Sequence, residues 1–237
     1  TNNVAVGAYA LDANTTATGN IAVGYNSLTA NTTGATNTAV GYYALAANTT
    51  AAYNTAIGNA AMQSSNGGAG NTAVGSSALN AATTGDYNTA VGMNSGLSMT
   101  SGDRNVAMGH ESLDACTTGQ YNVAIGTASL GSLTTAASNT AIGTNSGAAI
   151  TTGTRNTAVG GYSLDANTTA NDNVAVGWGA LTANTTGASN TALGTTALEA
   201  NTTASNNTVV GYNAMSTNTT GASNVAMGMN ALFTNST

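Results

Sequence analysis

Residues 122–129 read NVAIGTAS. The same pattern appears seventeen residues earlier as NVAMGHES (residues 105–112) and seventeen later as NTAIGTNS (residues 139–146). An Asn followed four residues later by Gly recurs at this step fourteen times without an insertion, from Asn3 with Gly7 to Asn224 with Gly228. Surface loops normally tolerate insertions. A spacing that never changes therefore predicts identical layers stacked directly on one another.

The residue types inside one copy predict strands. We number the positions of each copy from its Asn: position two is β-branched, three is Ala in all copies but one, four is apolar and five is Gly. This alternation is typical of a strand. We expect positions two and four to face the core, and positions one, three and five to face away from it. Leu at position nine and a small residue at eleven predict a second short strand on the same core.

The repeat therefore predicts an all-β fold, a parallel β-solenoid of fourteen 17-residue coils, each with two or three short strands and tight turns. A single array spans residues 1–237, with coils that begin at Asn3, Asn20, Asn37 and every seventeenth residue to Asn224, and with no separate caps. Ends without caps are typical of a fibre segment or of subunits stacked end to end. We expect stacked amides to pair from coil to coil. The ladder residues include Asn3, Gly7, Asn20, Gly24, Asn37, Gly41, Asn122, Gly126, Asn224 and Gly228.

Charged side chains make up only 4% of the chain, and Arg104 and Arg155 are its only Lys or Arg residues. Phosphate binding needs clustered cations, so we expect no nucleic-acid partner. No stretch approaches the roughly 20 apolar residues of a membrane span, so no membrane insertion is expected. The single cysteine, Cys116, excludes an internal disulfide.

The unit Asn122-Val123-Ala124-Ile125-Gly126 with Ser129 resembles the head repeat of trimeric autotransporter adhesins, the YadA-like head. Similar repeats occur in phage tail fibres and other bacterial surface fibres. The resemblance covers the whole chain through its repeat core, although the period here is longer than is usual for those heads. It implies a left-handed β-roll, commonly trimeric, that serves in adhesion or as a shaft. It also implies an extracellular, cell-surface or virion location.

The titratable residues do not converge in the sequence. The acids are scattered, and the only histidine, His110, stands beside Glu111, which is typical of a solvated surface pair. No triad, phosphate-binding loop or metal-ligand spacing is present. We therefore expect no catalytic residue, no cofactor and no metal site, and a protein that is not an enzyme.

Two related segments, NSGLSMTSGDRN (residues 94–105) and NSGAAITTGTRN (residues 145–156), contain the two arginines. One interpretation is a contact patch formed by Arg104 and Arg155. The other is a duplicated three-coil block in which the missing Leu of position nine is displaced to Leu97 and Ile150.

Asn-x-Ser/Thr sequons recur at position twelve. They are candidate glycosylation sites if the chain is exported, or turns in which Asn and Thr bond the backbone. The eight residues are Asn14, Asn31, Asn48, Asn167, Asn184, Asn201, Asn218 and Asn235.

These observations predict a structural fibre module that associates with copies of itself, as a trimer or head to tail. Ala39, Gly41 and Ala44 are expected to let a second backbone approach closely. Cell-surface glycans are a further expected partner, because Tyr and Trp side chains such as Trp178 suit a sugar-binding stripe. Two alternatives stay open. One is an ice-binding solenoid that uses the Thr ladders of positions thirteen and fourteen. The other is a tail spike that binds or cleaves carbohydrate, which would need paired carboxylates.

Overall fold

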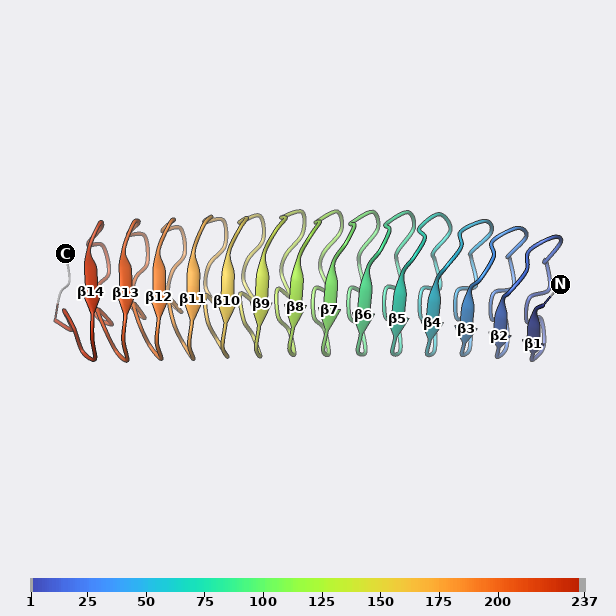
Figure 1. Cartoon of the computed structure of the whole chain (residues 1–237), viewed down its shortest axis with the longest axis horizontal. Coiled ribbons are helices and arrows are strands. Elements are labelled where there is room, and N and C mark those ends of the chain that lie inside the picture. Colours follow the sequence, from blue (N-terminus) through green and yellow to red (C-terminus); the bar gives the residue numbers. More distant parts are fainter. Residues whose placement is uncertain (1, 235–237) are drawn as a thin grey trace. The chain divides into compact units, whose positions relative to one another are not determined.

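The computed structural model describes residues 2–234 and contains fourteen strands of three residues each, one per copy of the repeat (Figure 1). By its internal contacts the chain divides into two compact units, Thr1–Gln120 and Tyr121–Thr237. The strands of the first unit are β1 Val4–Val6, β2 Ile21–Val23, β3 Thr38–Val40, β4 Thr55–Ile57, β5 Thr72–Val74, β6 Thr89–Val91 and β7 Val106–Met108. Those of the second are β8 Val123–Ile125, β9 Thr140–Ile142, β10 Thr157–Val159, β11 Val174–Val176, β12 Thr191–Leu193, β13 Thr208–Val210 and β14 Val225–Met227.

Within each unit, consecutive strands pair in parallel and in register. Val4 lies opposite Ile21 in the first unit, and Thr157 opposite Val174 in the second. Residues seventeen apart are thus neighbours across the sheet, and the predicted parallel β-solenoid is confirmed. None of residues 2–234 forms a helix, so this part of the chain has no helical membrane span.

The prediction of a second strand in each coil is wrong. Positions seven and nine adopt the left-handed conformation, as Tyr43 with φ 55° and Leu45 with φ 53° illustrate, whereas a strand requires negative φ. The backbone still stacks there, since Leu28 N–H donates to the carbonyl of Ala44 in the next coil at 2.9 Å. This edge of the coil is a turn that repeats from layer to layer.

The prediction of which strand positions face the core is also wrong, because the inner and outer faces are reversed. Position three is buried, and Ala22, Ala39 and Ala56 have no exposed surface. The Asn of position one is buried beside it in most coils. The branched residues of positions two and four point outward instead, and Ile57, for example, is 40% exposed. The interior of a 17-residue coil is narrow, so the inward strand positions hold Ala and Asn, and Leu at position nine supplies the largest core side chain.

Position five is glycine because adjacent coils touch there. At Gly41, whose φ is 141°, a Cβ atom would stand 2.3 Å from the carbonyl oxygen of Gly58 in the next coil. Real Cβ atoms do not approach an oxygen so closely, and few side chains tolerate that φ. The invariant Gly therefore follows from the spacing between coils.

The same packing corrects the expectation for Ala39, Gly41 and Ala44. Ala39 and Ala44 are fully buried inside their own coil, and Gly41 faces the next coil of its own chain. Their small size is needed for the folding of the single chain, and they do not form a surface for a second backbone.

Candidate functional site

The position-one asparagines hold each coil closed and tie it to the next. Asn20 Nδ2 donates to the carbonyl of Gly34 in its own coil at 2.9 Å, and its Oδ1 accepts the backbone N–H of Asn37 at 2.8 Å. Asn3 and Asn122 accept from Asn20 and Asn139 in the same way, at 2.9 and 3.0 Å. The expected amide-to-amide pairing is only an additional contact here, as between Asn156 Nδ2 and Asn139 Oδ1 at 3.2 Å.

The carbonyl of position fifteen is the functional partner that the sequence interpretation missed. It accepts two amides at once where position twelve is Asn. At Gly34, both Asn20 Nδ2 and Asn31 Nδ2 donate at 2.9 Å. All thirteen residues at this position, from Ala17 to Gly221, are Ala or Gly, and that restriction was the available signal.

The candidate glycosylation residues are mostly interior. Asn31, Asn48, Asn167, Asn184, Asn201 and Asn218 have no exposed surface. In these residues Nδ2, the atom that would carry a glycan, donates to the carbonyl three residues later, as from Asn48 to Ala51 at 3.0 Å. A folded coil therefore does not present these nitrogens to an enzyme. Asn14 is half-buried with the same bond, to Ala17 at 3.3 Å, and Asn235 lies outside the described residues.

Amide side chains pair directly from coil to coil where position twelve is Asn, and they form one ladder in each unit. Asn48 Nδ2 donates to Asn31 Oδ1 at 2.9 Å, and Asn201 Nδ2 donates to Asn184 Oδ1 at 2.9 Å. The first ladder ends where the next coil has Ser65. Asn48 Oδ1 and Ser65 Oγ are both buried there without a hydrogen-bond partner among the described residues.

The two arginines contact different partners. Arg104 lies over the ring of Tyr87, with Cζ 5.5 Å from the centroid. Arg155 forms two hydrogen bonds with Asp172, at 2.7 and 2.9 Å, and this guanidinium lowers the pKa of the Asp172 carboxyl. Arg104 lies in the first unit and Arg155 in the second.

The segments around the two arginines compensate for glycine at position nine. Beside Gly96 lies the buried Met99, and beside Gly147 lies the buried Ile150. Ile150 therefore fills the space as expected, whereas Leu97 is only half-buried and Met99 does so in its place. Positions nine and twelve share one compartment of the core.

Two acidic residues of the first unit contact the backbone of an adjacent coil. Asp86 and Asp103 lie at the same position of adjacent coils, a pair that the sequence interpretation missed, but they bond the backbone. Asp86 Oδ1 accepts the N–H of Ala69 at 2.7 Å, and Asp103 Oδ1 accepts the N–H of Asp86 at 2.9 Å. His110 Nε2 lies 3.4 Å from Glu111 Oε1, and both side chains are substantially exposed. Among residues 2–234 no group of three His, Cys, Asp or Glu side chains is arranged to hold a metal ion.

The Thr ladder of position thirteen is already hydrogen-bonded. Thr15 Oγ1 donates to the carbonyl of Thr32 at 2.9 Å, and Thr32 Oγ1 to that of Thr49 at 3.1 Å. These residues lie in a bend and not on a flat strand. Their hydroxyl donors serve coil stacking, which weakens the case for an ice-binding array at this edge.

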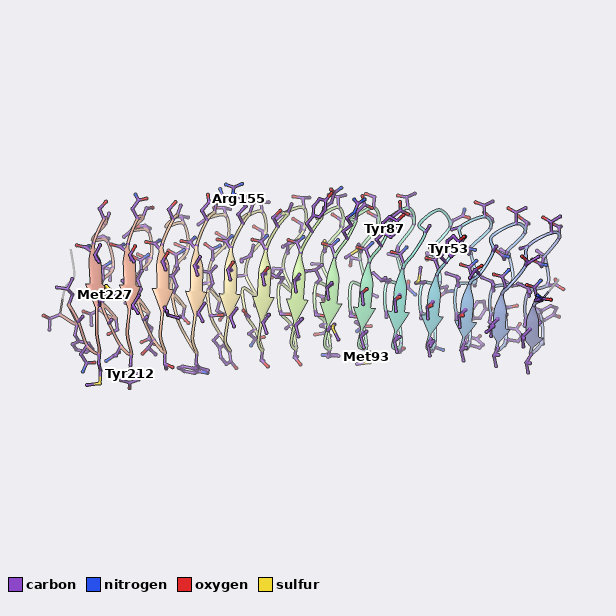
Figure 2. The ribbon with its side chains drawn as sticks, in the orientation of Figure 1. Tyr53, Tyr87, Met93, Arg155, Tyr212 and Met227 are labelled. Atoms are coloured by element: carbon purple, nitrogen blue, oxygen red, sulfur yellow. The ribbon has the colours of Figure 1, made fainter. Side chains whose placement is uncertain are left out.

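The outward side of the strands is the candidate interaction surface. We define the strand face as positions two and four of the strands in one unit. Position four is apolar in all fourteen copies, and position two is Val, Ile or Thr, so no charge interrupts the face. Val6 is 57% exposed in the first unit and Leu193 46% in the second. Met227, at position four of β14, is visible in Figure 2 and is also exposed.

Aromatic side chains gather at the two ends of the strands. Tyr53 and Tyr87 of position seventeen lie beyond one end of their strands, and Tyr212 of position six lies beyond the other end of its strand (Figure 2). The rings of Tyr25 and Tyr42 stack at 5.5 Å, and Tyr42 also contacts Tyr43 at 4.5 Å. A hollow of about 690 Å³ lies beside Tyr43, Gln63 and Asn66.

No protein-family model, no curated protein and no solved structure matches the chain.

Proposed function

We propose that this chain is a structural, non-enzymatic fibre module that associates with other copies of itself through the strand face. The observation that carries the proposal is the exposure of an uncharged strip on the strands of each unit, apolar at position four and β-branched at position two. Soluble monomers rarely expose continuous apolar surface, and such patches mark sites of association. The proposed setting is extracellular, cell-surface or virion-borne.

The strand face is exposed on a backbone that is already ordered, which favours association. Val6, Ile57 and Met108 belong to one ladder in the first unit, and each is at least 40% exposed. The flanking backbone is fixed by hydrogen bonds to neighbouring coils, so little conformational entropy is lost when a second surface covers it. Burial of such side chains contributes about 25 cal/mol per Å².

Lateral association through the strand face is the first mode that we propose, with a closed trimer as the expected form. Head-to-tail stacking is the second. In that mode the backbone groups of a terminal coil would pair with those of another copy in the register that neighbouring coils already use.

The test is the mass of the assembly in solution, measured by sedimentation and light scattering over a concentration series. Val74→Glu with Val91→Glu places two charges on the strand face of adjacent coils. We expect this variant to dissociate to monomers while its circular dichroism is unchanged, because an unpaired carboxylate is costly to bury. A wild-type chain that is monomeric at every concentration contradicts the proposal.

Thr84→Glu with Ser101→Glu is the matched control. These exposed side chains belong to the same two coils but lie in the bend of position fourteen. We expect this variant to assemble as the wild type does. Equal dissociation of both variants would mean that net charge, and not the strand face, governs association.

A further inference from the structure

Two adjacent coils of the second unit carry a glycine and an aromatic residue at positions six and seven, in opposite order. The first has Gly161 and Tyr162 at positions six and seven, and the next has Trp178 and Gly179. A Cβ atom on Gly161 would lie 3.4 Å from the Trp178 indole, so Gly161 is in direct van der Waals range of that ring. No other copy of the repeat has glycine at position six or at position seven.

Gly179 leaves a hollow next to the indole. The hollow has a volume of about 260 Å³ and is lined by Tyr162, Trp178, Gly179, Thr182 and Glu199. The rings of Tyr162 and Trp178 lie 6.1 Å apart with an interplanar angle of 70°, and Trp178 is 56% exposed. Two aromatic walls thus meet at an angle around a space that solvent reaches.

Two polar side chains of the hollow, Thr182 and Glu199, present acceptors to it. The Thr182 hydroxyl donates to the carbonyl of Tyr162 at 2.7 Å, so its remaining capacity is to accept. The Glu199 carboxylate accepts only, and it has no ion-pair partner among the described residues. The chain has only two cationic residues, and in this unit Arg155 is bound to Asp172. The hollow therefore combines π faces with an uncompensated negative charge.

We propose that this hollow binds an alkylammonium group. Trp is the strongest aromatic partner for a cation, and quaternary ammonium ions are recognised by aromatic walls of this kind. The net charge of −6 adds attraction at longer range. A neutral sugar carries no charge for the π faces and the carboxylate to attract. The site uses none of the strand face, so this proposal can be tested independently of the proposed self-association.

The test uses the only Trp of the chain as its reporter. A ¹⁵N-labelled protein gives a single indole N–H signal in a two-dimensional NMR spectrum, and this signal comes from the site itself. We expect a saturable shift on titration with choline, with a dissociation constant in the millimolar range that is usual for so small a ligand. The neutral isostere 3,3-dimethylbutan-1-ol and methyl β-glucoside should leave the signal in place.

A phosphocholine titration distinguishes the sources of such a group. The carboxylate of Glu199 repels a neighbouring phosphate, so we expect weaker binding than for choline, as for an ammonium group on an amine or a peptide. Tighter binding of phosphocholine would overturn that assignment in favour of a lipid-type headgroup. Equal shifts with choline and its neutral isostere, a shift with the glucoside alone, or no shift with any probe would overturn the proposal.

Two variants localise the effect. Gly179→Asn fills the hollow with a residue that position seven already carries elsewhere, at Asn26 and Asn145 with φ 54° and 52°. The backbone therefore tolerates it, and we expect the choline response to disappear. Glu199→Gln should weaken binding about threefold to fivefold, the loss of one partly exposed charge pair. Asp12→Asn, an equal charge change in the first unit, should leave binding unchanged. Retention of full binding by Gly179→Asn contradicts the site.

Discussion

Position twelve is buried throughout the described chain except near its start, yet it is filled in two chemically different ways. In the first unit Asn31 and Asn48 join an amide ladder, whereas Ala82 and Met99 two to three coils further on are apolar. In the second unit the order is reversed, from Leu133 and Ile150 to the ladder of Asn167 and its successors. The same backbone position therefore accommodates either a hydrogen-bonded amide side chain or an apolar one.

The comparison shows that each residue depends on like neighbours. An amide in the ladder donates to the amide of the preceding coil and to its own position fifteen, so an isolated Asn would keep only part of its partners. An apolar residue instead fills space next to position nine, as Met99 does beside Gly96. The cost arises at the change from one filling to the other, where Asn48 Oδ1 and Ser65 Oγ are unsatisfied.

The largest effect is expected from interruption of a ladder. Asn201→Leu removes the donor to Asn184 Oδ1 and the acceptor of Asn218 Nδ2. A buried acceptor left without a partner costs about 1–3 kcal/mol, and a larger side chain adds strain of about the same size. We expect the free energy of unfolding, measured by urea denaturation, to fall by about 4 kcal/mol. A change below about 1 kcal/mol would mean that the ladder contributes little.

The reciprocal change places one amide among apolar neighbours. Leu133→Asn removes a fully buried Leu and introduces an Oδ1 atom that faces Ile150 in the next coil, where no donor is available. We expect a loss of about 3 kcal/mol from the lost apolar burial and the unpaired acceptor. Leu133→Met, which conserves volume, is the control and should cost less than about 1.5 kcal/mol. Equal losses would show that shape, and not polarity, decides.

Cys116 gives the apolar filling a pH dependence. Burial raises the pKa of its thiol from 9.0 to about 11. The unfolded chain therefore ionises first, and the stabilisation is complete below about pH 9 and is lost as the pH rises towards 11. Relative to Cys116→Ala, the wild type should lose about 2 kcal/mol between pH 8 and pH 10.5. Urea denaturation of both chains at the two pH values measures it, and a constant difference would contradict burial of the thiol.

The smallest effect, and the only stabilising one, is expected at the end of the first ladder. Ser65→Asn supplies an Nδ2 atom opposite Asn48 Oδ1, and this atom can also donate to the carbonyl of Gly68, as the other ladder residues do at position fifteen. One unpaired atom, the new Oδ1 that faces Ala82, then replaces the two that are buried there now. We expect a gain of about 1 kcal/mol in the free energy of unfolding. Ser65→Ala, which leaves Asn48 Oδ1 unpaired, should be nearly neutral, so a destabilised Ser65→Asn chain would refute the ladder argument.

Much of the architecture could be read from the repeat. The constant step of seventeen predicted the parallel pairing that places Ala39 opposite Ala56. The close approach at the invariant glycines is between coils of one chain, whereas the sequence interpretation expected a second chain there. The direction of the side chains could not be read in this way. Alternation defines two faces without saying which is inner, and the rule that branched apolar residues are buried gave the wrong choice for Val40 and Ile57.

The candidate surfaces were harder to predict for the same reason. Because positions two and four were assigned to the core, the exposed strand face was not recognised as a surface. The hollow beside Trp178 depends on glycines at two different positions of adjacent coils, and this relation becomes visible only when the coils are stacked. The burial of the sequon asparagines likewise depends on position fifteen, which lies close to them only in the closed coil.

By itself the sequence determined the period, the parallel register and the positions that must be small, because these follow from identical units repeated without insertion. Only the tertiary structure decided that Leu45 adopts a left-handed conformation and that Val40 faces outward. Both choices are locally unfavourable, and an αL residue other than Gly costs about 1–2 kcal/mol. The hydrogen bonds to neighbouring coils and the narrow interior offset that cost, and both exist only once the coils are stacked.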